Sequence, residues 1–387
     1  MKFSKINNKV VIVHYGNVIN CPPVLNVCEA LVNNGIKTHL ISGTINNIKN
    51  TLITHPLFTF SDLGNFKTEN NYIDKIKKRA NLYLNMRREF CENMDLEDIV
   101  WTTNEVSVMF LNNLLKPYHR QHVMQLMELI NYCPISYQFP LLKFPIQAYA
   151  RQAWKTVVPE INRAYIQKVE WNLNRTPYIL PNKSYYLQPG PMSPELTAAL
   201  DIMKNEKRKI ILYMGIFSLD RDMEPFINAL GELGDEYCLI AIGRISEVME
   251  SRKQHILENS SNFRYLGFYK PPDHLHFLQY AHIGLTPYKP SHDIKYVSPL
   301  NSLYCAPNKI FEYAGYGIPM IGTDVLGLRT PFERYNIGIC CSDLSPNSIA
   351  NAIKIIERNY NKMSKNCIEF YNSVHIDKII NNIIYDD

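Results

Sequence analysis

The sequence predicts an α/β protein made of two doubly wound, parallel-sheet domains in tandem. With 387 residues, the chain is longer than the roughly 250–300 at which a single hydrophobic core stops growing. Near the N-terminus, an apolar segment, a glycine-bearing loop, a helical pattern, a glycine and a second apolar segment follow one another. The same alternation restarts near Lys209. Both starts are typical of a βαβ unit, in which a helix joins two parallel strands.

The elements of the first domain follow from apolar runs bounded by glycine and proline. Apolar side chains at positions 24, 27, 28 and 31 predict a helix that Gly35 ends, and a further helix is expected over 159–173. Strands are expected at residues 9–14, 37–41, 99–102, 122–127, 155–158 and 178–180.

The second domain shows the same pattern, with glycines directly after several strands. Its strands are expected at residues 210–215, 237–242, 263–266, 283–286 and 318–322, and its helices at 223–233, 248–257, 272–280, 308–316 and 346–358. Two parallel-sheet domains in tandem imply a cleft between them.

Composition excludes several classes of protein. A net charge of +5 falls short of a nucleic-acid-binding signature. The nine cysteines include no C-x-x-C pair, so neither zinc nor a disulfide framework is expected, and a reducing cytoplasm fits better. The first βαβ unit lacks G-x-G-x-x-G, which disfavours a nicotinamide or flavin cofactor. We see no signal peptide, and no apolar run reaches the roughly 18 residues of a membrane span.

Residues 307–324 (PNKIFEYAGYGIPMIGTD) carry most of the functional information. They predict a helix that starts after a proline, a glycine stop and a short strand. Lys309 and Glu312 then fall near the helix start, where free N–H groups, the helix dipole and the lysine favour a phosphate. A carboxylate one turn further in can accept hydrogen bonds from ribose hydroxyls. The alternative is a weak surface ion pair between residues three apart.

This segment resembles the nucleotide-sugar motif of retaining glycosyltransferases of the family-four type, P-x-K-x-x-E-Y-x-x-x-G-x-P-V-I, over about eighteen residues. The resemblance implies a GT-B fold with two Rossmann-like domains. It also implies that Lys309 meets the donor diphosphate and Glu312 holds the ribose. Such folds return a final helix to the first domain, so we expect a first domain over 1–185 plus 366–387 and a donor domain over 186–365.

Other segments extend the resemblance over most of the chain. Residues 215–224 look like the family's G-x-x-x-x-x-R-G-x-E variant, in which the arginine, here Arg221, points at the donor phosphates. Residues 263–268 match the segment whose backbone reads the base, and 159–164 and 179–182 match the end of the acceptor domain. Gly243, Gly267 and Phe268 are therefore further candidates for donor binding.

Arg221 has alternative interpretations. It can form a surface ion pair with Asp220, Asp222 or Glu224. Asp220-Arg221-Asp222 also spells a D-x-D, which in single-domain transferases would hold a metal ion. We disfavour the metal interpretation because the motif lies in the second α/β unit, just ahead of a helix.

The acceptor side offers fewer signals. Gly16 can bring backbone amides close to a sugar or phosphate, and His14 ends the first strand, where open α/β sheets bind ligands. A histidine at such a position is nevertheless more often structural than catalytic. By resemblance, Glu128 takes the place of the acid in the family's H-E element. Met127 replaces the histidine before it, and Tyr304 replaces a glutamate near the transferred sugar. Asn301 or Ser302 is a candidate substitute for the sugar contact.

Two further groups have simple interpretations. Residues 73–90 predict a basic amphipathic helix with Ile73, Ile76, Ala80, Tyr83 and Phe90 facing inward. Its cations then form a solvated face or dock on anionic lipid at an inner membrane leaflet. His274 and His276 are expected on a solvated surface.

Taken together, these patterns predict a cytoplasmic, metal-independent glycosyltransferase that uses a nucleotide-sugar, with UDP-sugar favoured, and needs no cofactor. The candidate catalytic residues are Arg221, Lys309, His14 and Glu128. The expected acceptor is a glycan or lipid-linked glycan, as in surface polysaccharide synthesis, and no nucleic-acid partner is expected. The alternatives are a nucleotide-sugar epimerase of the same fold and a nucleotide-binding protein that has lost transfer.

Overall fold

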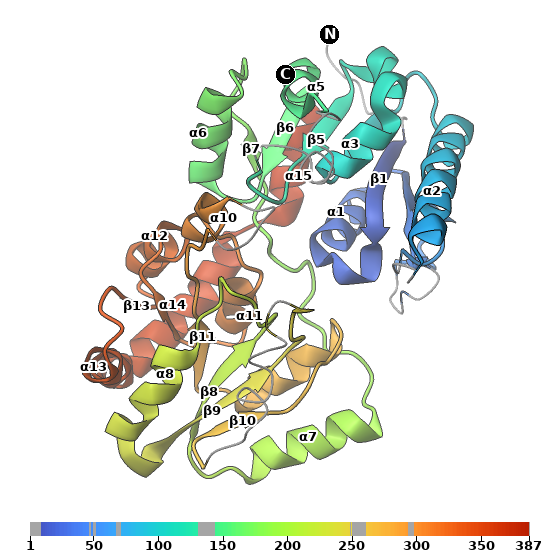
Figure 1. The fold of residues 1–387 in the computed structure, drawn as a ribbon. Helices are drawn as coiled ribbons and strands as arrows, with labels where there is room; N and C mark the ends of the chain where they lie inside the picture. Colours follow the sequence, from blue (N-terminus) through green and yellow to red (C-terminus); the bar gives the residue numbers. More distant parts are fainter. Residues whose placement is uncertain are drawn as a thin grey trace. The chain divides into compact units, whose positions relative to one another are not determined.

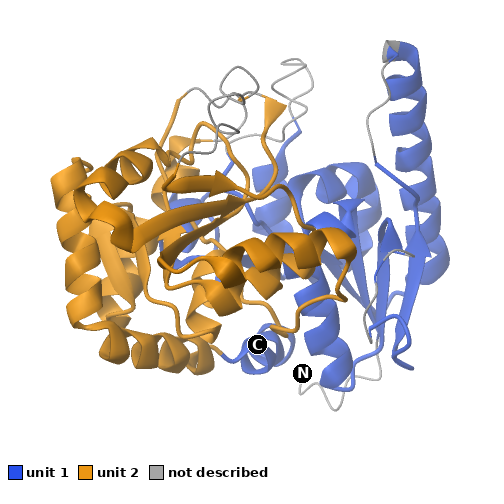
Figure 2. Cartoon of the chain, turned by 90° about the horizontal axis from the view of Figure 1, so that it is seen from below, with its two compact units in different colours: residues 1–181, 375–387 blue, residues 182–374 orange. Residues whose placement is uncertain are grey.

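The computed structural model describes residues 9–45, 48, 52–66, 71–130, 144–247, 249, 261–292 and 298–386. The chain divides into two compact units (Figure 2). Unit 1 comprises residues 1–181 and 375–387, and unit 2 comprises residues 182–374.

Unit 1 is built on a seven-stranded sheet with the order β3-β2-β1-β4-β5-β6-β7 (Figure 1). Every strand pair in this sheet is parallel. The strands are β1 (Val10–Asn17), β2 (Thr38–Gly43), β3 (Phe58–Asp62), β4 (Ile99–Thr102), β5 (His122–Gln125), β6 (Lys155–Val158) and β7 (Tyr178–Ile179). The α-helices are α1 (Pro22–Asn33), α2 (Tyr72–Asn93), α3 (Glu105–Leu111), α5 (Ile146–Gln152), α6 (Ile161–Glu170) and α15 (Ile376–Tyr385).

Unit 2 has a six-stranded sheet with the order β10-β9-β8-β11-β12-β13, again with every pair parallel. The strands are β8 (Lys209–Met214), β9 (Tyr237–Ile242), β10 (Phe263–Tyr265), β11 (Ile283–Thr286), β12 (Met320–Thr323) and β13 (Gly338–Cys341). The helices are α7 (Pro194–Asn205), α8 (Glu224–Ala229), α10 (Pro299–Leu303), α11 (Lys309–Gly315), α12 (Leu326–Tyr335), α13 (Pro346–Arg358) and α14 (Tyr360–Ser373), with 3-10 turns η4 (Leu230–Glu236) and η6 (Asp273–Tyr280).

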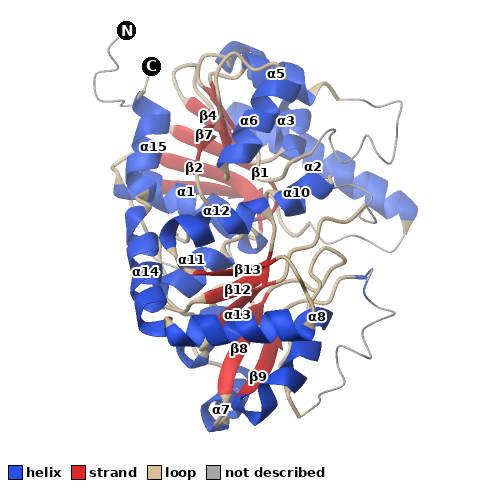
Figure 3. Ribbon diagram, turned by 90° about the vertical axis from the view of Figure 1, so that its left-hand side faces the viewer, coloured by secondary structure: helices blue, strands red, loops and turns tan. Residues whose placement is uncertain are grey.

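Helices cover both faces of the unit 2 sheet (Figure 3). Alternate residues of β8 point to opposite faces. Leu212 packs into one core with helices α7, α11 and α14, whereas Ile211 packs into a second core with α8 and α13. A strand buried on both faces reads as a continuous apolar run, which is why β8 was predictable from the sequence.

The expected fold class is confirmed, but the domain boundaries differ from those expected. Phe370 of α14 stacks on Phe311 of α11 with ring centroids 5.1 Å apart, so α14 belongs to unit 2. Only α15 returns to unit 1, where it packs against α1 and Asp377 accepts a hydrogen bond from Asn34. The expected returning segment, 366–387, therefore begins too early.

Several elements were missed or altered. Strands β3 and β13 lie at the two sheet edges and were not predicted. The expected helix over 223–233 is divided into α8 and η4, and that over 272–280 is a 3-10 helix. Most of the expected helix over 248–257 lies outside the described residues. No helix of the described chain combines the length and apolar character needed to cross a membrane.

The expected orientation of α2 was wrong in part. Phe90 is buried as predicted, but Ile73 is 58% exposed and Ile76 is 53% exposed. The helix packs on the protein through Leu82, Met86 and Phe90, which lie on a different face, so its first turns leave isoleucine in solvent.

Replacing Gly243 by alanine should destabilise unit 2. A Cβ atom there would lie 1.6 Å from the carbonyl oxygen of Gly215, and the φ angle of 146° is one that other residues rarely adopt. We expect a loss of about 1–3 kcal/mol or more, measured by calorimetry. Gly231→Ala is the matched control, because nothing lies within 4 Å of an added Cβ at that position. A Gly243→Ala variant as stable as the parent protein would contradict this packing.

Candidate functional site

Glycines end the three adjacent strands β8, β9 and β10 of unit 2. Gly215, Gly243 and Gly267 have φ angles of 154°, 146° and 98°. The amide of Gly215 donates to the carbonyl of Ile242 (2.9 Å), and that of Gly243 donates to the carbonyl of Gly267 (2.8 Å). The carboxyl edge of the sheet therefore presents bare backbone, which a ligand can approach closely.

Helix α11 is fixed to the end of β8 by Tyr313. The buried Tyr313 hydroxyl donates to the carbonyl of Leu212 (2.8 Å) and accepts from the amide of Met214 (3.2 Å). Gly284 on β11 makes room for the ring, since a Cβ there would lie 2.5 Å from it. The described pairing of β8 with β11 reaches only to Leu212. The Tyr313 hydroxyl therefore supplies hydrogen bonds to the Leu212 carbonyl and the Met214 amide at the end of that pairing.

This anchoring places the Lys309 ammonium against Gly215. A Cβ at residue 215 would lie 2.7 Å from Lys309 Nζ, so only glycine leaves room for it. The ammonium is half-buried, 5.1 Å from the ring centroid of Tyr213 and 5.4 Å from that of Tyr288. Within the described part of the chain, Lys309 makes no ion pair. Burial, together with the positive charge of Arg221, lowers the pKa of Lys309 to about 7.

Arg221 lies on the same aromatic ring. Its Cζ is 3.9 Å from the ring centroid of Tyr288, and the two backbones form an antiparallel bridge. The guanidinium donates to the carbonyl of Asp220 (3.0 Å) and pairs with the Asp220 carboxylate. The ion-pair alternative for Arg221 is therefore correct in its partner, but the pair is partly buried rather than on an open surface.

The Asp220 carboxylate accepts hydrogen bonds from three side chains of the protein. It accepts from the hydroxyls of Ser218 and Ser302 as well as from Arg221. Although burial acts to raise the pKa of Asp220, the charge of Arg221 and the two hydroxyls hold it below its ordinary value. The second acid of the D-x-D, Asp222, pairs with Lys289 at 3.1 Å. No group of three or more metal-ligating side chains gathers among the residues that the structure describes.

Two cations therefore lie near the ring of Tyr288, and among the described residues only Arg221 has a carboxylate partner. The positive charges of Arg221 and Lys309 repel each other, and a bound anion would offset this repulsion. The arrangement therefore favours an anion with several oxygens, such as a diphosphate. Helix α11 has only seven residues, so its dipole adds little, and the two cations carry the attraction.

Glu312 lies one turn into α11 and is buried. Its Oε1 is 3.3 Å from Nε2 of His274, which comes from η6. The other ring nitrogen of His274 is buried without a hydrogen-bond partner. The expectation that His274 lies on a solvated surface was wrong. His276 is also held, since its Nε2 is 2.6 Å from the carbonyl oxygen of Gly190.

The remaining candidates of unit 2 lie around this cluster. Asn301 is in α10, which Ser302 ties to Asp220, and Tyr304 caps the same helix. Phe268 is largely exposed, with the Arg244 guanidinium 4.8 Å from its ring centroid. An exposed aromatic ring with a cation over it can stack with a base.

The candidates of unit 1 lie at the carboxyl edge of the first sheet. His14 is buried, its Nδ1 is 2.9 Å from the Thr103 hydroxyl, and a Cβ on Gly16 would lie 2.8 Å from its Nε2. Burial lowers the pKa of His14 to about 4. The ring is therefore neutral at physiological pH and can exchange hydrogen bonds but cannot supply charge.

Glu128 and Met127 follow β5. Glu128 is exposed, with one carboxylate oxygen 3.9 Å from the Arg163 guanidinium. The Met127 sulfur accepts a hydrogen bond from the Cys21 thiol (3.4 Å), and the Met127 carbonyl accepts one from the Arg163 guanidinium (2.6 Å). The structure thus groups His14 with Gly16, and Arg221 with Lys309, Gly215, Gly243 and Gly267, in separate units.

Sequence reasoning named Asp220 as a possible partner of Arg221 but missed Tyr213, Tyr288, Tyr313 and His274 as parts of the site. Tyr313 could have been suspected, because a tyrosine directly follows the glutamate in the motif. The others come from segments distant along the chain, and no local pattern marks them.

Comparisons with known proteins identify the fold. No protein-family model matches the chain, and no curated protein resembles it by sequence. Among solved structures, HepE from Anabaena in complex with UDP and glucose is similar at a TM-score of 0.67 and 12% identity, covering 98% of both chains. Sucrose-phosphate synthase from Thermosynechococcus elongatus is similar at a TM-score of 0.68 and 14% identity, covering 97% of both chains.

A third similar structure is a protein from Listeria monocytogenes provisionally described as a UDP-N-acetylglucosamine 2-epimerase, with a TM-score of 0.59 and 12% identity over 97% of this chain and 95% of that one. The chain thus has the GT-B fold. At such identities the likeness establishes the fold alone, and one fold hosts several activities.

Replacing Lys309 by methionine should stabilise the free protein near neutral pH. The folded-state pKa of about 7 lies below the ordinary value of 10.5, so the unfolded chain binds more protons between these values. The stability of the parent protein therefore rises with pH in this window, and the advantage of Lys309→Met should shrink toward pH 10. Chemical denaturation at pH 6.5, 8 and 9.5 measures this, with exposed Lys354→Met as control. A pH-independent difference would contradict the buried ammonium.

Proposed function

We propose that this protein is a glycosyltransferase that binds the diphosphate of a nucleotide-sugar in unit 2 and transfers the sugar to an acceptor. One observation carries the proposal. Lys309 holds a half-buried ammonium without a carboxylate partner among the described residues, against the backbone of Gly215 and on the same ring as Arg221. A structure that brings two cations together at a strand edge is suited to an anion.

The chemistry follows from charge. Cleavage of the bond between the sugar and the diphosphate leaves negative charge on the diphosphate, and fixed cations lower the energy of that state. Arg221 supplies a guanidinium oriented by Asp220, and Lys309 supplies an ammonium whose pKa an anion would raise. Each charge-assisted hydrogen bond contributes about 1.5–3 kcal/mol.

Glu312 holds the ribose of the donor in this proposal. A buried carboxylate accepts hydrogen bonds from neighbouring hydroxyls, and His274 fixes one of its two oxygens. For the base, exposed Phe268 offers a ring on which it can stack. Gly243 and Gly267, which follow β9 and β10, offer backbone without side chains. UDP is the favoured nucleotide, in line with the UDP and glucose bound by HepE.

The finer points rest on resemblance. Transfer with retention of anomeric configuration, and an acceptor that is a growing surface glycan or a lipid-linked glycan at the inner face of an anionic membrane, fit the motif of residues 307–324. In unit 1, neutral His14, the backbone at Gly16 and exposed Glu128 are the groups we assign to the acceptor and the transferred sugar. Epimerisation is the alternative, because the Listeria protein shares the fold.

Removing either charged side chain of α11 should weaken nucleotide binding. After a thermal-shift screen of UDP, GDP and ADP identifies the best nucleotide, we expect Lys309→Ala and Glu312→Ala each to raise its dissociation constant by about tenfold or more, which is about 1.4 kcal/mol. Titration calorimetry measures the constants. Lys354→Ala and Glu333→Ala are controls, because both side chains are exposed on other helices. Unchanged affinity in folded Lys309→Ala and Glu312→Ala variants would refute the assignment.

Transfer should not require a metal ion. The D-x-D carboxylates are paired with Arg221 and Lys289, so we expect release of sugar from the matching donor to proceed at the same rate in excess EDTA. Arg221→Lys should lower the turnover by about tenfold to a hundredfold with a smaller change in nucleotide affinity, because a planar guanidinium is lost from the departing diphosphate. Loss of activity in EDTA that Mg²⁺ or Mn²⁺ restores would contradict this mechanism, and interconversion of the donor sugar without release would favour the epimerase.

A further inference from the structure

The outer face of α2 carries an apolar stripe that the protein itself does not cover. Ile73, Ile76 and Leu84 are 58%, 53% and 60% exposed. With Ala80, also exposed, they repeat at spacings of three and four residues, which places them along one side of the helix. The face that packs on unit 1 is a different one, formed by Leu82, Met86 and Phe90. Single exposed apolar residues are normal, but an aligned set marks an interaction surface.

Cations surround the N-terminal end of this stripe. Lys75, Lys77, Lys78 and Arg79 occupy the first two turns of α2, where Asp74 is the single acidic residue. Positive side chains at a helix N-terminus oppose the helix dipole, so they gain little from their own helix. Further along the helix, Arg87 donates to the carbonyls of Phe110 and Leu111, and Arg88 pairs with Glu89.

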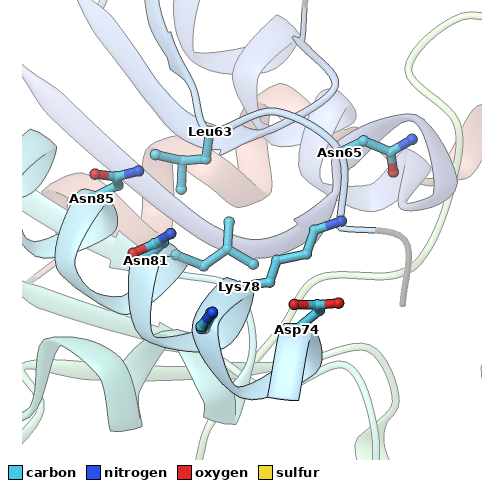
Figure 4. A pocket seen from close by; sticks show the side chains of 8 residues that line it. Leu63, Asn65, Asp74, Lys78, Asn81 and Asn85 are labelled. Carbon is cyan, nitrogen blue, oxygen red and sulfur yellow. The ribbon is translucent and has the colours of Figure 1, made fainter. Parts of the chain in front are cut away.

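A pocket of about 380 Å³ with both polar and apolar lining residues lies beside the stripe. Figure 4 shows Asp74, Lys78, Asn81 and Asn85 on successive turns of α2, facing the segment after β3 that carries Leu63 and Asn65. Asn65 also accepts a hydrogen bond from Asn17 at the end of β1 (3.0 Å), which places the pocket at the carboxyl edge of the unit 1 sheet. Amide groups of this kind donate to phosphate oxygens and exchange hydrogen bonds with hydroxyls.

We propose that α2 docks on an anionic lipid surface, with the stripe inserted at the headgroup boundary and the pocket occupied by a hydroxylated headgroup. Each part of the surface matches one part of such a lipid. The apolar stripe meets acyl chains, the cations meet phosphates, and the amides meet the polyol of the headgroup. A second copy of this chain fits less well, because it would bring the same cluster of cations against itself. A nucleic acid would leave the isoleucines in water.

The inference deepens the proposed function by naming the surface on which the acceptor would be met. The statement that the acceptor is met at this surface rests on the proposed function, whereas the docking itself does not. The docking is measured on the full chain without nucleotide, so its failure and the failure of nucleotide binding in unit 2 are distinguishable.

Vesicle binding tests the stripe. The full chain should co-sediment with vesicles of phosphatidylcholine and phosphatidylglycerol mixed equally, and bind vesicles of phosphatidylcholine alone much more weakly. The triple variant Ile73→Ser, Ile76→Ser and Leu84→Ser should lose affinity for the anionic vesicles by about tenfold or more, since these side chains make few contacts within the protein. Ile355→Ser, an exposed isoleucine on α13, is the matched control and should bind like the parent protein.

A second variant tests the pocket. Asn81→Ala with Asn85→Ala should weaken binding to phosphatidylglycerol vesicles but not to vesicles containing phosphatidic acid, whose headgroup is a phosphate without a polyol. The triple stripe variant binding anionic vesicles as tightly as the parent protein would overturn the proposal. So would self-association in solution that the stripe variant abolishes while vesicle binding is absent. Circular dichroism spectra and melting temperatures that match those of the parent protein confirm that every variant is folded.

Discussion

The position of one ammonium group organises the site in unit 2. Lys309 Nζ can lie against Gly215 because no Cβ stands there, and it reaches that place because Tyr313 fixes α11 to the backbone of β8. The hydrogen bonds of Tyr313 are favourable, but the placement of the ammonium is not. Burial and the charge of Arg221 lower the pKa of Lys309 to about 7, which means that the protonated ammonium is less stable in this position than in water. Local unfavourable arrangements of this kind persist where a ligand compensates them.

The elements with two buried faces were the predictable ones. β9 and β11 are continuous apolar runs closed by glycine or proline, and their bounds agree with the sequence prediction. β3 and β13 lie at sheet edges, and only Phe58 of β3 and Cys341 of β13 are buried. In β3, Thr59, Ser61 and Asp62 interrupt the apolar run that would mark a buried strand. α2 shows a different limit. Its sequence offers two apolar faces, and periodicity alone does not distinguish which of them is buried. In the structure the face with Leu82 and Met86 is buried, and the face with Ile73 and Ile76 is exposed.

The candidate site divides in the same way between local and distant information. Lys309 and Glu312 lie three residues apart in one motif, so a local pattern could single them out. His274 reaches Glu312 from 38 residues away, and Ser302 reaches Asp220 from 82 away, and such contacts exist only after the sheet has formed. Asp220 illustrates the consequence. As a D-x-D residue it suggests a metal ligand, whereas in the folded chain one of its oxygens accepts from Arg221 and from Ser302 of α10, and the other accepts from Ser218.

Charge is distributed unequally between the two units, and this limits what each can contribute. At the carboxyl edge of the first sheet, burial keeps His14 neutral above a pH of about 4, so that ring can position a hydroxyl but cannot balance a departing anion. At the corresponding edge of the second sheet, Arg221 and Lys309 supply charge on fixed elements. In the proposed transfer, positive charge fixed before the reaction costs no reorganisation when the diphosphate departs, which is why we assign the diphosphate to unit 2 and the neutral acceptor to unit 1.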